Sequence, residues 1–266
     1  MTATIMSFNL RYNNPNDGRY AWPNRKTAIR DVISAHNPDV LCTQEGLEDM
    51  LEEISRAFPA YDRFGHGRMA DRSDEHVAIF VNTSRLRVRA HGQFWISPEP
   101  EVPGSRAWDT LFPRICTWCV VEAHESGELL AVFNVHLDNR QVLARQEGAR
   151  LLCDMMPRIA LEHDVPPGAV ILCGDFNAYP DTPEVQLFCD VSSVETGAYT
   201  MFGCDEISLG TYHGFRGVPA PAPIDYILNG AAVTVHSRTV DQKQYDDTWP
   251  SDHFPVIAEI SVSGQG

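Results

Sequence analysis

Short apolar runs, separated by polar segments that contain glycine, proline, asparagine or aspartate, recur along the whole chain. Several are rich in β-branched residues and alternate between apolar and polar positions, with the period of two that is typical of strands. The pattern predicts about ten strands, at residues 3–8, 39–43, 76–82, 86–96, 115–124, 129–137, 169–174, 224–228, 232–240 and 254–262.

Three further segments place apolar residues at the spacing that is typical of a helix with one buried face. These predicted helices cover residues 24–36, 46–57 and 140–163, and Pro157 is expected to kink the third. The sequence contains no linker, low-complexity tract or convincing repeat. Strands interleaved with helices favour one α/β domain over residues 1–266, with mixed sheets covered by helices.

The net charge narrows the kind of ligand that the protein is expected to bind. Of the 266 residues, 21 are Lys or Arg and 36 are Asp or Glu, and 21 − 36 gives a formal net charge of −15. A broad basic surface for nucleic acid is therefore not expected, because non-specific affinity comes mostly from Lys and Arg at phosphates. A local basic pocket for a small anion is compatible with this charge.

The chain shows no sign of membrane insertion or secretion. Its first residues lack the features of a secretory signal, and no apolar run approaches the ~20 residues that span a bilayer. Seven cysteines, an odd number, include Cys42, Cys153 and Cys173 in apparent core segments, which favours free thiols and a reducing compartment. Cys116 and Cys119 lie three apart on a predicted strand and face opposite sides, so a redox or zinc role is not expected. We therefore expect a cytoplasmic protein that does not act at membranes.

Polar side chains of a particular kind gather where the predicted strands end or begin. Each alone has an ordinary explanation, since Asn and Asp are common in turns and Glu is favoured at a helix start. Together, carboxylates, amides and imidazoles without clustered thiolates are what a hard divalent cation and a phosphate ligand recruit. The set comprises Asn9, Arg11, Gln44, Glu45, His136, Asp138, Asn139, Asp175, Asn177, Asp225, Asp252 and His253.

Spacing within these motifs indicates which side chains point in the same direction. Asp175 and Asn177 lie two apart, so in an extended chain both project to one side while Phe176 points into apolar surroundings. The adjacent Asp252 and His253 point apart if the chain is extended there, which suits one contact to a metal and one to a substrate.

Three motifs in order, "GDFN", "IDYI" and "SDHFPV", complete a pattern that resembles the endonuclease/exonuclease/phosphatase superfamily, which includes deoxyribonuclease I. The matching segments extend from Ser7 to Val256. The resemblance implies a four-layer α/β sandwich, in which two mixed β-sheets pack face to face with helices outside. It also implies a phosphoesterase that depends on Mg²⁺ or Mn²⁺.

The same resemblance assigns metal ligands and a base. Asn9 and Glu45 are implied to hold the principal metal ion, with Asp252 or Asp225 assisting. Asp175 is implied to orient or deprotonate the attacking water.

Further residues are implied to bind or orient the phosphate. Asn177 is implied to contact phosphate or metal, and His253 to donate a hydrogen bond to a phosphate oxygen. Arg11 and Arg114 match phosphate-binding arginines of several members. His136 matches the histidine of the "THL" motif in the deoxyribonuclease, sphingomyelinase and deadenylase branches; abasic-site endonucleases have a tyrosine there.

Three residues have two interpretations each. Glu75 either orients His136, as a glutamate does in family members, or is a solvated loop charge. Trp22 and Trp108 either stack on a sugar or base or pack in the core or a lid, whereas Trp95 is expected in the core.

The favoured function is hydrolysis of a small phosphorylated molecule, a sugar phosphate or small phosphodiester, by in-line attack of water. The segments "RYNNPNDGRYAWPNRK", "GLEDML" and "GQFWISPEPEVPGSRAWD" resemble a bacterial-type branch with sugar-phosphate phosphatases among its members. A nuclease acting on DNA or RNA is the main alternative, and an inactive binding module is a remote one. The oligomeric state is left open.

Overall fold

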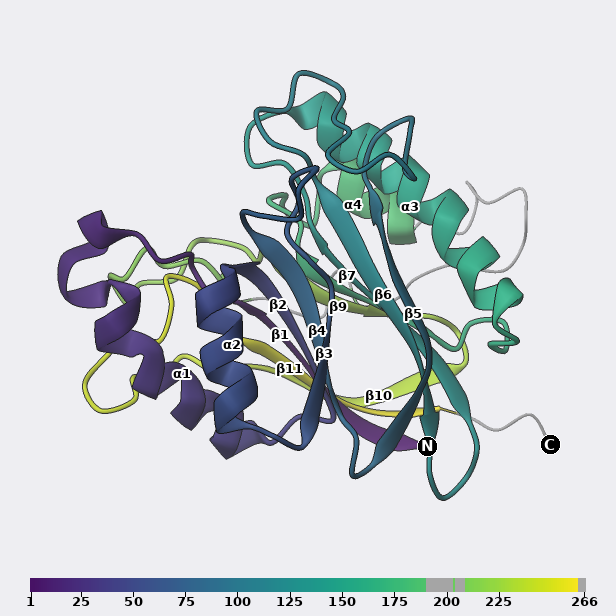
Figure 1. Ribbon diagram of the computed structural model, residues 1–266, viewed down its shortest axis with the longest axis horizontal. Helices are drawn as coiled ribbons and strands as arrows, with labels where there is room; N and C mark the ends of the chain where they lie inside the picture. The colour runs from purple at the N-terminus through teal and green to yellow at the C-terminus, as the bar shows by residue number, and fades with distance from the viewer. Residues whose placement is uncertain (190–202, 204–208, 263–266) are drawn as a thin grey trace.

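Two β-sheets lie face to face at the centre of the computed structural model, which describes residues 1–189, 203 and 209–262 (Figure 1). Among these residues, one sheet has six strands in the order β10 (Val233–Val240), β11 (Val256–Val262), β1 (Thr2–Asn9), β2 (Val40–Gly46), β4 (His76–Asn82) and β3 (Tyr61–Phe64). The other has five, in the order β5 (Leu86–Trp95), β6 (Ile115–Ala123), β7 (Leu129–His136), β8 (Val170–Asp175) and β9 (Asp225–Asn229). One parallel pair in each, β1 with β2 and β7 with β8, makes both sheets mixed.

Helices cover the outer face of each sheet. Helices α1 (Trp22–His36) and α2 (Glu48–Ala57) lie against the six-stranded sheet, and α3 (Val142–Glu162) and α4 (Pro183–Cys189) against the other (Figure 1). Ile29 and Leu51 of the first pair share a core cluster with Phe8 and Phe80 of the strands. The larger cluster fills the space between the sheets and the space under α3. This arrangement confirms the four-layer α/β sandwich.

All ten predicted strands and all three predicted helices form, and three short elements were missed. These are β3, the 3₁₀ helix η1 (Pro15–Tyr20) and α4. The strand β3 has only four residues and two of them are charged, while α4 has seven, too few to show a helical period. Helix α3 continues on both sides of Pro157. The single domain over residues 1–266 stays a prediction.

The cysteines agree only in part with the expectation of free thiols. Cys42 and Cys173 are free and buried, as are both residues of the Cys116–Cys119 pair, but Cys189 is disulfide-bonded. The expectation is therefore wrong for Cys189, because an odd number of cysteines does not exclude a disulfide among them. The cysteine usage then argues less strongly for a reducing compartment, and a cytoplasmic location stays a prediction. Within the described part of the chain, no helix is both long and apolar enough to cross a membrane.

Candidate active site

Three neighbouring strands bring predicted site residues to one edge of the five-stranded sheet. The parallel pair β7–β8 aligns His136 with Asp175, and the antiparallel pair β8–β9 aligns Asp175 with Asp225. Because β9 runs in the opposite direction, its first residue lies at the edge where β7 and β8 end. His136 and Asp225 are almost ninety residues apart in the sequence, yet they lie on either side of Asp175 in the sheet.

The other sheet supplies Asn9 and Glu45 from the ends of β1 and β2. The side-chain amide of Asn9 donates to Asp175 Oδ2 (3.0 Å) and to Glu45 Oε1 (3.1 Å), so it bridges the two sheets. Glu45 has a positive φ of 61°, and the Tyr12 amide donates to its Oε2 (3.1 Å). A left-handed backbone at a non-glycine residue costs about 1–3 kcal/mol and is typical of functional positions.

The "GDFN" turn fixes Asp175 from both sides. Gly174 has a φ of 145°, and a Cβ on it would lie 2.0 Å from the carbonyl oxygen of Val135, so only glycine fits between β7 and β8. Phe176 is fully buried and packs on Tyr226, with ring centroids 4.8 Å apart. The backbone N–H of Asn177 donates to Asp175 Oδ1 (2.9 Å). This bond makes an Asx-turn, which is the ordinary structural role of an aspartate at a strand end. The same turn also fixes Asp175 at the site.

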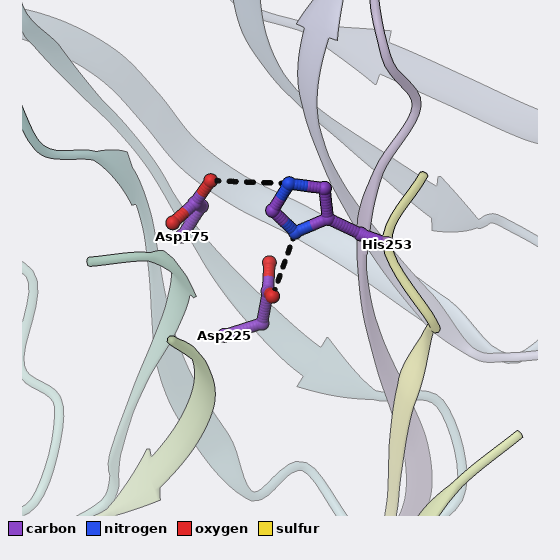
Figure 2. Close-up of side chains that lie close together, drawn as sticks. All are labelled: Asp175, Asp225 and His253. Carbon is purple, nitrogen blue, oxygen red and sulfur yellow. Dashed lines mark hydrogen bonds and ion pairs between the residues drawn. The ribbon is translucent and has the colours of Figure 1, made fainter. Parts of the chain in front are cut away.

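His253 lies between two acids (Figure 2). Its Nδ1 is 2.8 Å from Asp225 Oδ2, and its Nε2 is 3.9 Å from Asp175 Oδ2. Burial alone lowers the pKa of His253, but the charges of Asp225, Asp175 and Asp252 outweigh it and raise the pKa well above its usual range. A protonated imidazole has two donors and no lone pair. In that state the ring is suited to donate to an anion. If the ring is neutral, one of its nitrogens can instead join oxygens of Asp175 and Asp225, all within 4.8 Å of one another, as a metal ligand.

The carboxylates around His253 carry unbalanced negative charge. Burial, followed by the charge of Asp225, raises the pKa of Asp175 to about 7, and burial also raises the pKa of Asp252. Asp225 Oδ1 is buried and has no hydrogen-bond partner among the described residues. Several carboxylates that repel one another, with one carboxylate oxygen that has no hydrogen-bond partner among the described residues, are suited to bind a hard divalent cation. Asp252 lies close enough to His253 and Glu45 for their charges to act on its pKa.

On its other side His136 faces Glu75, the residue considered from the sequence for orienting it, and Glu75 has a partner, Arg68, that only the structure reveals. Its Nε2 is 3.7 Å from Asp175 Oδ2 and its Nδ1 is 3.9 Å from Glu75 Oε2. Glu75 in turn accepts two hydrogen bonds from Arg68, at 2.9 and 3.1 Å. Burial and the charges of Arg114 and Arg68 lower the pKa of His136, which favours the neutral ring. Arg68 has no sequence signal, since the loop that returns it to Glu75 is irregular.

A cleft of about 580 Å³ opens beside these residues, and Glu45 and His136 form part of its wall. Among the described residues that line it, four are arginines (Arg11, Arg68, Arg114 and Arg140) and four are acids (Glu45, Asp74, Glu75 and Asp138). Leu111 and Phe112 add an apolar wall, with the Arg68 guanidinium 4.4 Å from the ring centroid of Phe112.

Arg11 and Arg114 both face this cleft, and each is held by an acid. The Nε and Nη2 atoms of Arg11 donate to Asp17 (3.0 and 3.1 Å), and its Nε is 3.8 Å from Asp252. Nε of Arg114 donates to Asp138 Oδ2 (3.2 Å). Asp138 belongs to the strand-end set but was given no role from the sequence, and the structure makes it the residue that orients Arg114.

Neither tryptophan that was considered for stacking belongs to the residues that line the cleft. Trp22 begins α1 and is only 3% exposed, packed in the core under that helix. Trp108 is partly buried against the core between the sheets. Core packing is therefore the better interpretation for both. Trp95 is buried as expected, and its indole N–H donates to the carbonyl oxygen of Arg68 (2.7 Å).

A sandwich that gathers carboxylates, amides and histidines beside an arginine-lined cleft defines a class, the phosphoester hydrolases. The sequence pattern of the Endonuclease/Exonuclease/phosphatase family matches residues 6–253. The chain belongs to this family, whose members hydrolyse phosphoesters with the help of a divalent metal ion. The resemblance inferred from the motifs is thereby confirmed.

Solved structures of the same family align over the whole chain. A mannosyl-6-phosphatase from Bacteroides thetaiotaomicron is 30% identical, with a TM-score of 0.88 over 97% of this chain and 99% of that one. A family member from Bacteroides vulgatus is 25% identical, also with a TM-score of 0.88, over 99% of this chain and 100% of that one. These similarities agree with the branch that the sequence segments favoured.

Curated relatives are more distant. An uncharacterized protein of Acanthamoeba polyphaga mimivirus is 29% identical over 167 residues, which cover 59% of this chain and 60% of that protein. Human nocturnin is 22% identical over 270 residues, covering 91% of this chain and 59% of nocturnin. The chain thus matches about three fifths of the length of each. The nocturnin catalytic domain has a TM-score of 0.71 at 19% identity over 98% of this chain and 94% of that domain, a similarity of fold.

Proposed function

We propose that the protein is a Mg²⁺- or Mn²⁺-dependent phosphatase that removes phosphate from a small sugar phosphate. Its similarity over the whole chain to a mannosyl-6-phosphatase supports a sugar phosphate as substrate. A cleft of about 580 Å³ also lies within the range of about 300–1,000 Å³ that holds small-molecule ligands.

The observation that carries the proposal is the charge balance of the cleft. Its four arginines lie among four acids, a balance of 4 − 4, and burial raises the pKa of Glu75 to about 7, so these groups leave little net charge. Arg11, Arg68 and Arg114 are each paired with a carboxylate. A groove for long nucleic acid needs a row of cations for successive phosphates. A balanced cleft in a chain of charge −15 favours one phosphate group and a polar, uncharged body.

A divalent ion held by Asn9, Glu45 and Asp252 would neutralise the non-bridging oxygens of the phosphate and stabilise the leaving oxygen. Asp175 is the base in this proposal. Its pKa of about 7, raised by burial, means that its carboxylate can accept a proton near neutral pH. Attack forms a bond between the water oxygen and phosphorus as the bond to the sugar oxygen breaks. The water proton passes to Asp175, and the departing sugar oxygen takes a proton from solvent water to leave as the alcohol.

Donors around the base would bind the phosphate. His253, kept protonated by Asp225, offers Nε2–H on the side of Asp175, and Arg114 and Arg11 offer guanidinium N–H groups at the cleft. Asn177 lies two residues after the base and is suited to contact the phosphate or the metal. His136, oriented by Glu75, is suited to stabilise the charge that develops on the phosphate oxygens.

Product formation from a matched panel tests the proposal, measured as phosphate for the hexose phosphates, nitrophenol for the diester and shortened strands for the nucleic acids. The panel contains hexose 6-phosphates, bis(p-nitrophenyl) phosphate, a single-stranded oligonucleotide and poly(A), each with Mg²⁺, Mn²⁺ or EDTA. We expect release from at least one hexose phosphate with either metal and none with EDTA. Degradation of the oligonucleotide or poly(A) while every hexose phosphate stays intact would make the protein a nuclease instead.

A further inference from the structure

Arg25, in α1, is buried in an unusual way. Its side chain has no exposed surface, although arginine is almost never fully buried unless it is paired. No carboxylate of the described residues accepts a hydrogen bond from it. Its acceptors are instead five backbone carbonyl groups, those of Leu10, Arg11, Tyr12, Tyr20 and Pro250.

These bonds use the whole guanidinium group. Nε donates to Tyr20 (2.8 Å), and Nη1 donates to Leu10 (2.5 Å) and Pro250 (2.9 Å). Nη2 donates to Arg11 and, at 3.5 Å, to Tyr12. A guanidinium has five N–H donors, so each has an acceptor. Lysine has only three donors and cannot reproduce this set.

The carbonyls that Arg25 fixes belong to the two segments that carry the proposed metal ligands. Residues 10–12 follow Asn9, and within them the Tyr12 amide donates to Glu45 Oε2 (3.1 Å) and the Arg11 amide to Asn9 Oδ1 (2.9 Å). Pro250 lies two residues before Asp252. One buried side chain thus ties the segment after β1 to the segment before β11.

Arg25 also holds a positive charge close to Asp252. Burial lowers its pKa to about 10, opposed chiefly by the charges of Asp252 and Asp17, so the group stays cationic at neutral pH. A fixed cation behind the carboxylates reduces their mutual repulsion without occupying a ligand position.

We propose that Arg25 is a positioning residue that sets the divalent-metal affinity of the site. It does so by locking the backbone that presents Asn9, Glu45 and Asp252. The proposal rests on the proposed function, since it takes these residues as the metal ligands. It also gives the segment "RYNNPNDGRYAWPNRK" a role, because Arg25 lies within it, as do three of its acceptors, Arg11, Tyr12 and Tyr20.

Binding of Mn²⁺ alone, measured by calorimetry, tests the proposal with Arg25→Lys and Arg25→Met. We expect the Kd of both variants to be weaker by about 10–100-fold, as when a group that orients metal ligands is lost. In Arg25→Lys, kcat recovers as Mn²⁺ is raised to saturation, because the ligands themselves are intact. Arg63→Met is the control. Arg63 lies on β3 and pairs with Glu48 of α2 (2.5 Å), so its loss removes an arginine that contacts no proposed metal ligand and should leave the Kd unchanged.

Two outcomes separate this proposal from the proposed function. If the wild-type protein binds and uses Mn²⁺ but Arg25→Lys binds it with the wild-type Kd, only the role of Arg25 is wrong. If the wild-type protein binds no divalent ion, the proposed function itself fails.

The wild-type protein provides a test that does not depend on a folded variant. Five acceptors should stop rotation of the guanidinium, so its Nη protons should give separate, slowly exchanging resonances in ¹⁵N spectra. The Tyr12 amide should become more protected from exchange when Mg²⁺, which is diamagnetic, is added. A single averaged Nη signal would overturn the proposal.

Discussion

Asp138→Asn separates binding of the phosphate from the chemical step. Asp138 accepts Nε–H of Arg114 on Oδ2 (3.2 Å) and the backbone amides of Arg140 and Gln141 on Oδ1 (2.9 and 2.7 Å). An asparagine can keep the backbone bonds through its oxygen, but its NH₂ group then faces another donor. The change thus removes one charge-assisted bond and leaves Arg114 oriented only by its second, weaker bond, from Nη2 to Asn139 Oδ1 (3.3 Å).

The size of the effect follows from that bond. A hydrogen bond to a charged group contributes about 1.5–3 kcal/mol, and each 1.36 kcal/mol is a factor of ten, so kcat/KM should fall by about 10–150-fold. Because Arg114 binds the phosphate in both ground state and transition state, the loss should be in KM, with kcat nearly unchanged.

Steady-state kinetics on a hexose phosphate at saturating Mn²⁺ measures both parameters. The matched control is Asp39→Asn. Asp39 likewise pairs with an arginine, Arg85 (2.9 Å), and accepts a backbone amide, that of Thr4, but it lies at the other end of β2 from Glu45. Its change should lower stability and leave KM alone. A fall in kcat at constant KM for Asp138→Asn would refute the role given to Arg114.

Three further predictions concern the supports of the site and the fold. Arg68→Met should lower kcat by about 10–100-fold through loss of the orientation of Glu75, and Arg68→Lys should recover part of it; an unchanged kcat in steady-state assays would contradict this. Phe176→Ala should cost about 3–5 kcal/mol in urea unfolding, because the ring is fully buried, and a loss below 1 kcal/mol would mean that the turn repacks. Burial alone raises the pKa of Asp241, but hydrogen bonds from His36 and Tyr245 outweigh it and lower the pKa. The ionised form therefore stabilises the fold above about pH 4. This contribution is lost as the pH falls through the lowered pKa. Asp241→Asn should therefore be less stable than wild type at pH 7, with the difference shrinking below about pH 4; a difference that is constant with pH would contradict the assignment.

The strands and the predicted site residues at their ends were accessible from the sequence for a shared reason. Alternation along a strand fixes which residues are buried, and the polar residue that follows marks the edge of the sheet, as at Asp175. The sequence could also place Phe176 in the core, because it lies between two polar residues that face the other side.

The contacts that orient the site were not accessible in this way. Arg68 pairs with Glu75 within one irregular loop, and Arg25 of α1 donates to Pro250 in another. Irregular loops have no repeating pattern of apolar residues from which such partners could be predicted. Trp22 was ambiguous because it stands where a loop becomes a helix, and only the packing of α1 decides its environment. Glu45 is presented by a left-handed backbone, which neither its residue type nor its neighbours predict.

Hydrolysis of a hexose 6-phosphate in H₂¹⁸O with Mn²⁺, followed by mass spectrometry, tests the central claim most directly. The account predicts one ¹⁸O in each released phosphate and none at O6 of the sugar, the oxygen that carried the phosphate, because water attacks phosphorus. Asp175→Asn should slow this release by at least about 10²-fold, as loss of a general base does. Label in the sugar hydroxyl, or full activity of Asp175→Asn, would contradict it.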